Sequence, residues 1–260
     1  MIFDTHAHYD DDAFDEDRES LLDSLPEHGI EGVVNVSASL SSCRQTVSLV
    51  ESYPFLYGAV GVHPSETAEL TEESFAWLKA AARSSKVVAV GEIGLDYYWE
   101  EPDHKIQKEW FHRQLELAKE LGLPVIIHSR EAANDTLQIL KEHSAAQLGG
   151  VIHCYSYSLE LAKEYEKMGF YFGIGGVVTF KNAKKLSEVV TYLPLERIVL
   201  ETDAPYLAPV PVRGSRNFSA NLLYIAQRIA ELKNISYEEV ITRTCENARK
   251  LYRLNGAEYG

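Results

Sequence analysis

Val87-Val88-Ala89-Val90 and Val125-Ile126-Ile127 are short, uninterrupted apolar runs, and they decide the fold that we expect of this chain. A strand that is buried on both faces has no polar alternation, so such runs are typical of the parallel sheet of an α/β protein. Similar β-branched runs recur along the chain and alternate with longer amphipathic stretches. We expect eight strands, at residues 2–5, 32–36, 56–62, 86–91, 124–128, 150–153, 170–174 and 197–202.

Helical patterns lie between these runs. Thr71 is an expected N-cap, and Ser236 with Glu239 has the spacing of a capping box before the last helix. Strands that alternate with helices predict parallel βαβ units, and eight units in 260 residues fit a (β/α)8 TIM-type barrel, which takes about 250 residues. We expect a single domain over residues 1–260, with an open sheet as the alternative. One apolar stripe recurs at helical spacing in the middle of the chain: Ile106, Trp110, Phe111, Leu115, Ala118 and Leu121.

The composition excludes several classes of protein. Hydrophobic residues make up 45% of the chain, which argues against bulk disorder. No apolar run approaches the roughly 18 residues of a membrane span, and no secretory signal is visible. Cys43, Cys154 and Cys245 lack C-x-x-C spacing, so we expect neither a disulfide framework nor a thiolate zinc site, and a cytoplasmic location fits best. The net charge of −14 weighs against non-specific coating of nucleic acid, but bound cations would attract phosphate locally.

Histidines and carboxylates stand at the carboxyl ends of the expected strands, and in a parallel barrel these ends converge on one face. A lone buried histidine is more often a hydrogen-bonded core residue than a ligand, but here the placement repeats at several strands. His6 and His8 lie at i and i+2, so their side chains point to the same side of a strand. These donors exceed the needs of one tetrahedral ion, so we predict two divalent ions with Glu92 between them, an arrangement suited to phosphoryl hydrolysis. The predicted ligands are His6, His8, Glu92, His128, His153 and Asp203, while His28, His104, His112 and His143 fall beside helices and are expected to be surface or packing residues.

Basic and aromatic side chains follow several of the same strands. Arg130, Arg213 and Arg216 carry guanidinium groups that match phosphate geometry, and we weigh a substrate role evenly against a solvated surface charge. We favour an exposed helix face for the lysines that follow strand seven, and packing over base stacking for the aromatics after Glu92. These residues are Lys181, Lys184, Lys185, Tyr97, Tyr98 and Trp99.

Seven short motifs stand in order along the chain. They are Asp4-Thr5-His6-Ala7-His8, Gly61-Val62-His63-Pro64-Ser65-Glu66, Gly91-Glu92-Ile93-Gly94-Leu95-Asp96-Tyr97-Tyr98, Pro124-Val125-Ile126-Ile127-His128-Ser129-Arg130, His153-Cys154, Thr179-Phe180-Lys181 and Glu201-Thr202-Asp203-Ala204-Pro205-Tyr206-Leu207. Together they resemble the TatD family of metal-dependent deoxyribonucleases. The resemblance runs from residue 2 to about 217, and the region of Asn247 also fits.

The resemblance implies an amidohydrolase-type barrel that hydrolyses DNA phosphodiester bonds with two divalent ions (Zn, Mn or Mg), as a 3′ to 5′ exonuclease or an endonuclease. It implies the same six ligands as the strand pattern, with Asp203 and Glu92 as the catalytic carboxylates. It also implies DNA, as a single strand or a 3′ end, as the substrate; the oligomeric state is open and a monomer is compatible with the sequence. The implied phosphate contacts are His63, Arg130, Arg213, Arg216 and Asn217.

Two departures from the family pattern concern the substrate. The family's R-G-x-R-N-E-P continues here after Asn217 as Phe218-Ser219, and its H-C-F-S-G ends here in Tyr157. Neither change touches a predicted ligand, but both could reshape the pocket. A small-molecule amidohydrolase or phosphoesterase on the same barrel is therefore the alternative function, and a non-enzymatic, metal-stabilised scaffold is a third.

Overall fold

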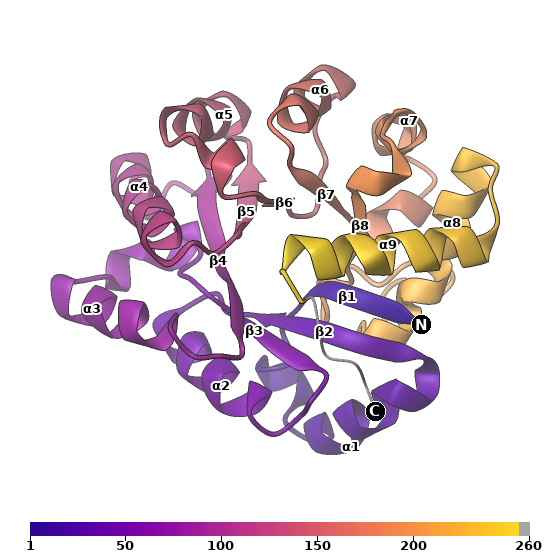
Figure 1. Cartoon of the computed structure of the whole chain (residues 1–260), viewed down its shortest axis with the longest axis horizontal. Helices are drawn as coiled ribbons and strands as arrows, with labels where there is room; N and C mark the ends of the chain where they lie inside the picture. The colour runs from indigo at the N-terminus through magenta and orange to yellow at the C-terminus, as the bar shows by residue number, and fades with distance from the viewer. Residues whose placement is uncertain (255–260) are drawn as a thin grey trace.

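Eight parallel strands, each hydrogen-bonded to the next in chain order, form the sheet of the computed structural model, which describes residues 1–254 (Figure 1). Ala7 bridges to Ala204, and His8 N donates to Ala204 O at 2.7 Å, so the last strand returns to the first and the sheet closes into a barrel. The expected (β/α)8 fold is confirmed, whereas residues 255–260 of the expected domain lie outside the described residues. The strands are β1 (Ile2–Ala7), β2 (Ile30–Val36), β3 (Leu56–Val60), β4 (Val87–Asp96), β5 (Val125–Arg130), β6 (Gly150–Ile152), β7 (Tyr171–Ile174) and β8 (Ile198–Leu200).

Helices surround the barrel (Figure 1). Thr71 accepts a hydrogen bond from Ser74 N and Ser236 accepts one from Glu239 N, so both predicted N-caps are present. Within the predicted central stripe, Ile106 is 39% exposed, because Gln107 is the buried residue of that turn. The helices are α1 (Arg18–Ser24), α2 (Leu40–Val50), α3 (Glu72–Ala81), α4 (His104–Leu121), α5 (Ala133–Glu142), α6 (Leu159–Lys167), α7 (Lys184–Tyr192), α8 (Leu222–Lys233) and α9 (Tyr237–Leu251).

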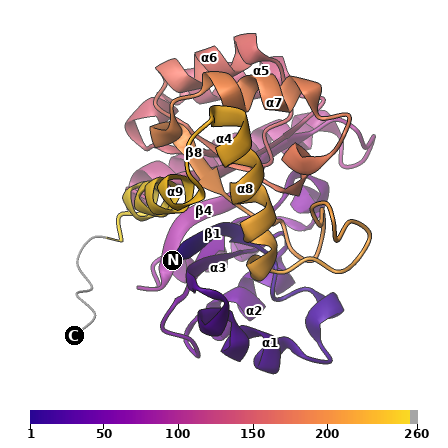
Figure 2. The same ribbon diagram turned by 90° about the vertical axis from the view of Figure 1, so that its right-hand side faces the viewer.

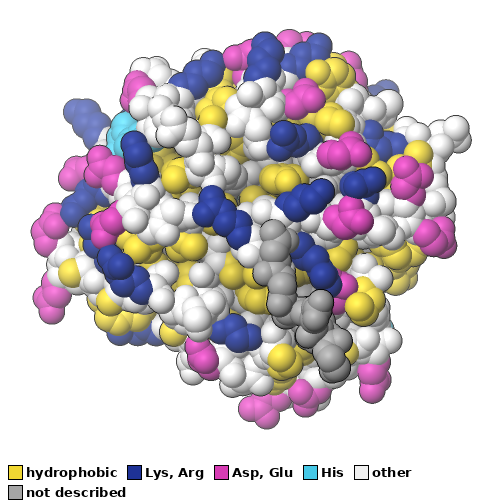
Figure 3. All heavy atoms as spheres, in the orientation of Figure 1, with side chains coloured by type: hydrophobic (Ala, Val, Ile, Leu, Met, Phe, Trp, Pro, Cys, Tyr) yellow, Lys and Arg dark blue, Asp and Glu magenta, His cyan; other side chains and the backbone are white. Residues whose placement is uncertain are grey.

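Helix α9 covers the amino-terminal end of the barrel and lies across the ends of β1 and β8 (Figures 1 and 2). Its buried Ala248 and Leu251 join a cluster with Phe3 and Val34 from the barrel interior, and Tyr252 donates to Thr5 O at 3.0 Å. The face that α9 covers carries Lys and Arg side chains spread among acidic ones (Figure 3). With this end closed, the carboxyl ends of the strands are where a site can open.

Strand β4 is longer than the sequence predicted. It was expected to end at residue 91, but it continues to Asp96, because Ile93 and Leu95 are still buried and the pairing with β5 runs to Asp96 and Arg130. Glu92 therefore lies inside a strand rather than at its end. A carboxylate at this depth is flanked by strands on both sides, which limits its freedom to move.

Candidate metal centre

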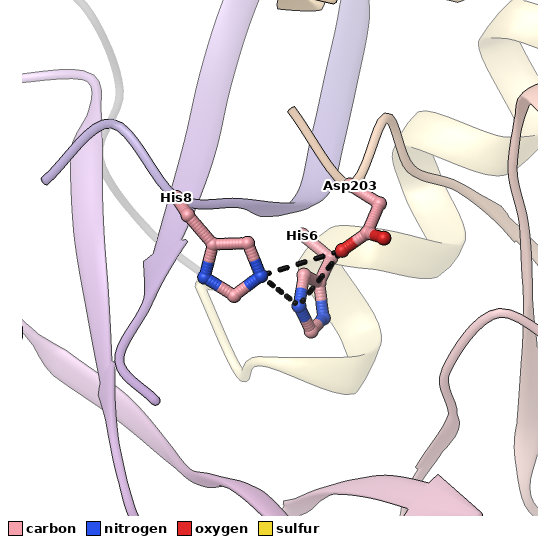
Figure 4. Close-up of side chains that lie close together, drawn as sticks. All are labelled: His6, His8 and Asp203. Atoms are coloured by element: carbon pink, nitrogen blue, oxygen red, sulfur yellow. Dashed lines mark hydrogen bonds and ion pairs between the residues drawn. The ribbon is translucent and has the colours of Figure 1, made fainter. Parts of the chain in front are cut away.

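The first and last strands bring three predicted ligands together (Figure 4). His6 Nε2 and His8 Nε2 lie 3.1 Å apart, and Asp203 Oδ1 is 3.3 Å from His8 Nε2 and 3.7 Å from His6 Nε2. The backbone holds this arrangement, because Asp203 N donates to His6 O at 2.9 Å. Two imidazole nitrogens and a carboxylate oxygen at these distances can hold a divalent ion.

Glu92 lies between two groups of nitrogen atoms. Its Oε2 is 3.4 Å from His6 Nε2, whereas its Oε1 is 2.7 Å from His128 Nδ1. His153 Nε2 lies 3.8 Å from Glu92 Oε1 and 3.5 Å from Asp203 Oδ1. All six predicted ligands thus converge from five strands or strand ends, and Glu92 lies within 4.0 Å of a ring nitrogen of each of the four histidines.

His63 also reaches this cluster, with Nε2 4.0 Å from Glu92 Oε1. Geometry alone groups it with Glu92 and His128 as a set that could hold an ion. However, Ser65 N donates to His63 Nδ1 at 3.1 Å, and an amide N–H can only donate. A neutral His63 must therefore carry its proton on Nε2, which makes that atom a hydrogen-bond donor rather than a ligand.

The carboxylates and imidazoles of the cluster stabilise each other's charged forms. Burial opposes ionisation of His8, but the Asp203 and Glu92 carboxylates raise its pKa to about 9. Burial likewise opposes the charge on His153, whose pKa is raised to about 10 by Glu201 and Glu92. In turn, burial would raise the pKa of Glu92, but the neighbouring histidines hold it well below its usual value. In the absence of an ion, protons on the imidazoles balance the carboxylates.

His63 differs from the other histidines of the cluster. Burial and the neighbouring His128 lower its pKa to about 3, so the ring is neutral at physiological pH. A neutral ring with its proton on Nε2 is a fixed donor that faces the cavity.

Three buried carboxylates outside the predicted ligand set contact the cluster or the turn beside it. Asp4 accepts hydrogen bonds from Thr202 Oγ1 and Ser219 Oγ, each at 2.7 Å, and burial raises its pKa to about 6. Asp96 Oδ2 lies 3.1 Å from His128 Nε2, and Glu201 Oε2 lies 3.1 Å from His153 Nδ1. Sequence reasoning missed Asp96 and Glu201, although both stand in the quoted motifs, and Asp96 follows Glu92 by four residues on one face of β4.

The cluster forms the floor of a cavity of about 440 Å³. Asp10, Asp12, Ser39 and Tyr206 lie on its walls. The floor consists of His8, His63, Glu92, His128, His153 and Asp203.

The other predicted substrate contacts are not among the residues that line this cavity. Arg130 stacks on the ring of Tyr98 at 3.7 Å, and Arg213 stacks on Phe180 at 4.2 Å. Arg216 pairs with both carboxylate oxygens of Asp17, at 2.8 and 2.6 Å.

Asn217 is fully buried, and its Nδ2 donates to Thr202 O at 2.9 Å and to Tyr206 O at 2.8 Å. Its side chain therefore joins the two ends of the turn that carries Asp203.

The two departures from the family pattern are accommodated away from the cavity floor. The Tyr157 hydroxyl is 3.0 Å from Ser129 Oγ and accepts from Ala132 N at 3.3 Å. Phe218 is part-buried, and its neighbour Ser219 holds Asp4. The predicted ligands therefore keep their arrangement with these residues in place.

A search of residues 1–254 for long apolar helices finds none that could cross a membrane.

Comparisons with known proteins agree with this geometry. A family model described as "TatD related DNase" matches residues 3–253. The chain is 45% identical to the uncharacterized metal-dependent hydrolase YabD of Bacillus subtilis, over 98% of this chain and 100% of that protein. It is 34% identical to the uncharacterized metal-dependent hydrolase YcfH of Escherichia coli, over 99% and 97% of the two chains.

Among solved structures, the TatD homologue YjjV of Escherichia coli superposes with a TM-score of 0.91 at 32% identity, over 97% of this chain and 98% of that one. Sequence and structure therefore agree along the whole length of the barrel. The chain belongs to the TatD family of metal-dependent hydrolases.

Proposed function

We propose that this protein is a deoxyribonuclease that cleaves DNA phosphodiester bonds with two divalent ions, acting on single strands or 3′ ends as a 3′ to 5′ exonuclease. The observation that carries the proposal is the position of Glu92, whose two oxygens face different nitrogens, 3.4 Å from His6 Nε2 and 2.7 Å from His128 Nδ1. A carboxylate with this surrounding is suited to bridge two ions, and two-ion sites suit phosphodiester hydrolysis.

The donor set fits such ions. His6, His8 and Asp203 would hold one ion, His128 and His153 the other, and Glu92 would contribute to both. When bound, the ions would activate a water and neutralise charge on the phosphodiester oxygens. Donors rich in imidazole favour Zn or Mn over Mg.

Asp203 is the proposed proton acceptor. Its side chain is 17% exposed, against 5% for Glu92, so it is the more open of the two carboxylates toward the cavity. Burial would raise its pKa, but the hydrogen bond from His8 and the charges of nearby histidines lower it, so it is ionised at neutral pH. An ionised carboxylate at the cavity floor can orient an attacking water and take its proton.

His63, Arg130 and Arg213 are the proposed phosphate contacts. The Nε2–H of His63 faces the cavity as a neutral donor and can bond a phosphate oxygen. Arg130 and Arg213 each stack on an aromatic ring, and a guanidinium and a ring together suit an unpaired nucleotide. Arg216 and Asn217 would serve the substrate by fixing the turn after β8.

The test is cleavage of labelled single-stranded and duplex DNA by protein reloaded with Mg²⁺, Mn²⁺, Co²⁺ or Zn²⁺. His128→Ala and Asp203→Ala should lower the rate by at least about 100-fold, because each removes a group that touches an ion or the water. Asp23→Asn changes an exposed carboxylate of α1 and is the matched control. Wild-type protein that cleaves neither DNA above the level of these variants, with any of the ions, contradicts the proposal.

A small-molecule phosphoesterase or amidohydrolase is the second candidate. Asp10, Asp11 and Asp12 line one wall of the cavity, and their charge disfavours a polyanion there. A higher kcat/KM for small esters or lactones than for DNA would favour this candidate.

A further inference from the structure

Two histidines of the metal centre have an outer ring nitrogen beside a fixed oxygen. His8 Nδ1 is hydrogen-bonded to Val36 O at 2.6 Å, whereas His153 Nδ1 lies 3.1 Å from Glu201 Oε2 as an ion pair without hydrogen-bond geometry. A carbonyl oxygen only accepts, so it keeps a proton on His8 Nδ1, and the negative charge of Glu201 favours a proton on His153 Nδ1. In both rings this leaves Nε2 to face the other donors of the centre.

His128 is turned the opposite way. Its Nδ1 faces the centre, 2.7 Å from Glu92 Oε1, and its Nε2 points outward to Asp96 Oδ2 at 3.1 Å. The ring therefore offers the nitrogen next to its Cβ, unlike His8 and His153. A neutral ring carries one proton, so an acceptor beside Nε2 keeps the proton there and leaves a free lone pair on Nδ1.

Asp96 is held rigidly for this purpose. It is 2% exposed, and the fully buried side chain of Gln107 bonds both its backbone N and its backbone O, each at 2.9 Å. Tyr98 N donates to Asp96 Oδ1 at 3.0 Å, so this oxygen is occupied and Oδ2 is the one directed at His128. The carboxylate cannot turn away without breaking the bond to Tyr98.

We propose that Asp96 is a positioning residue that keeps the proton of His128 on Nε2 and thereby reserves Nδ1 for the second divalent ion, beside Glu92. The inference rests on the proposed two-ion function and assigns a role to a residue that is outside both ligand sets. Carboxylates in this position orient metal-binding histidines, and their loss typically costs about 10- to 100-fold in metal affinity.

Asp96→Asn tests the positioning role directly, because the two side chains have the same shape and differ in which atoms donate and accept hydrogen bonds. Tyr98 N is a donor, so it selects the amide oxygen of the new side chain. The amide NH₂ then faces His128 Nε2, which must accept. The proton of a neutral His128 moves to Nδ1, the atom that has to bind the ion.

Asp96→Ala separates this role from simple packing. It removes the acceptor next to Nε2 without putting a donor in its place. His128 then no longer prefers the proton on Nε2, but it is not forced to carry the proton on Nδ1. Positioning therefore predicts second-ion affinity in the order wild type, Asp96→Ala, Asp96→Asn. Packing predicts the reverse order for the two variants, because alanine leaves a buried void and an unpaired Tyr98 N–H.

The experiment is calorimetric titration of metal-free, full-length protein with Zn²⁺, for wild type, both variants and the control Asp23→Asn. We expect two ions in wild type and control, an unchanged first ion in Asp96→Asn, and a second ion bound about 10- to 100-fold more weakly. Long-range ¹H–¹⁵N NMR spectra of the zinc-loaded proteins, labelled at histidine, should show His128 protonated on Nε2 in wild type and on Nδ1 in Asp96→Asn.

Three results would overturn the inference, and they have different meanings. Asp96→Asn that binds both ions as wild type does removes the positioning role and leaves the two-ion function intact. Asp96→Ala weaker than Asp96→Asn reduces Asp96 to a packing residue. Wild type that binds a single ion, with the His128 spectrum unchanged by zinc, contradicts the proposed function itself.

Discussion

Asn217→Ala should destabilise the protein rather than remove a substrate contact. Besides its two donated bonds, Asn217 Oδ1 accepts from Asn221 Nδ2 at 2.9 Å and from Phe218 N at 3.0 Å. The side chain thus makes four hydrogen bonds, and its donated bonds end on either side of Asp203, at Thr202 and Tyr206. Alanine would break all four and leave buried polar groups without partners.

The magnitude follows from this count. A hydrogen bond contributes about 1 kcal/mol net, so we expect a loss of about 4 kcal/mol in the free energy of unfolding. For a domain of this size that corresponds to a fall of roughly 8–16 °C in Tm. Urea unfolding should show a lower midpoint with an unchanged slope, since the surface exposed on unfolding does not change. DNA cleavage should fall in kcat, because the turn that carries Asp203 is loosened.

Asn134→Ala is the matched control, because Asn134 is exposed on α5 and should unfold as wild type does. The reasoning fails if Asn217→Ala loses less than about 1 kcal/mol of stability while its KM for DNA rises about tenfold or more. That combination would mean that the side chain binds substrate and contributes little to the turn.

Three further predictions concern the centre. Gly173→Ala would bring a Cβ into steric overlap with the Glu201 carboxylate, so we expect about 1–3 kcal/mol of destabilisation and weaker metal binding through His153; an unchanged Tm would contradict the close approach. At pH 7, metal uptake should release at least two protons, because His8 and His153 have pKa values raised to about 9 and about 10 and stay protonated without metal. Apparent affinity should therefore fall as the pH falls from that range, and calorimetry in buffers of different ionisation enthalpy measures the release; no buffer dependence would refute it. With free metal at 100 times Kd, bound ions should add about 2.7 kcal/mol to the free energy of unfolding. A chelator should remove this stabilisation, and added Zn²⁺ should restore the melting temperature.

The sequence was sufficient to predict the barrel, because strands buried on both faces leave unbroken apolar runs that periodicity detects. It also placed the six proposed ligands, since the carboxyl ends of parallel strands must meet. The end of β4 was missed because Gly91 and the charged Glu92 end the apolar run, whereas the pairing of residues 93–96 is with β5, about 34 residues further along the chain. The local sequence pattern around β4 gives no information about this pairing.

The residues that contact the predicted ligands, or the turn that carries Asp203, were harder to predict for a related reason. Arg216 and its partner Asp17 are 199 residues apart, and no local pattern distinguishes a paired arginine from one that meets phosphate. Asp96 and Glu201 are carboxylates beside other polar residues, and their significance depends on which nitrogen of a distant histidine faces them. Such choices arise from packing in three dimensions.

The barrel closes between its first and last strands, and this sets the stage of synthesis at which the metal centre can assemble. His6 and His8 are synthesised well before Asp203, which follows only when the eight strands of the barrel have been made. Until β8 docks beside β1, where Asp203 N bonds His6 O, a nascent chain has no complete set of donors. If the proposed cleavage of DNA depends on this centre, we expect the activity only after β8 has docked, and a chain that stops before Asp203 should lack it.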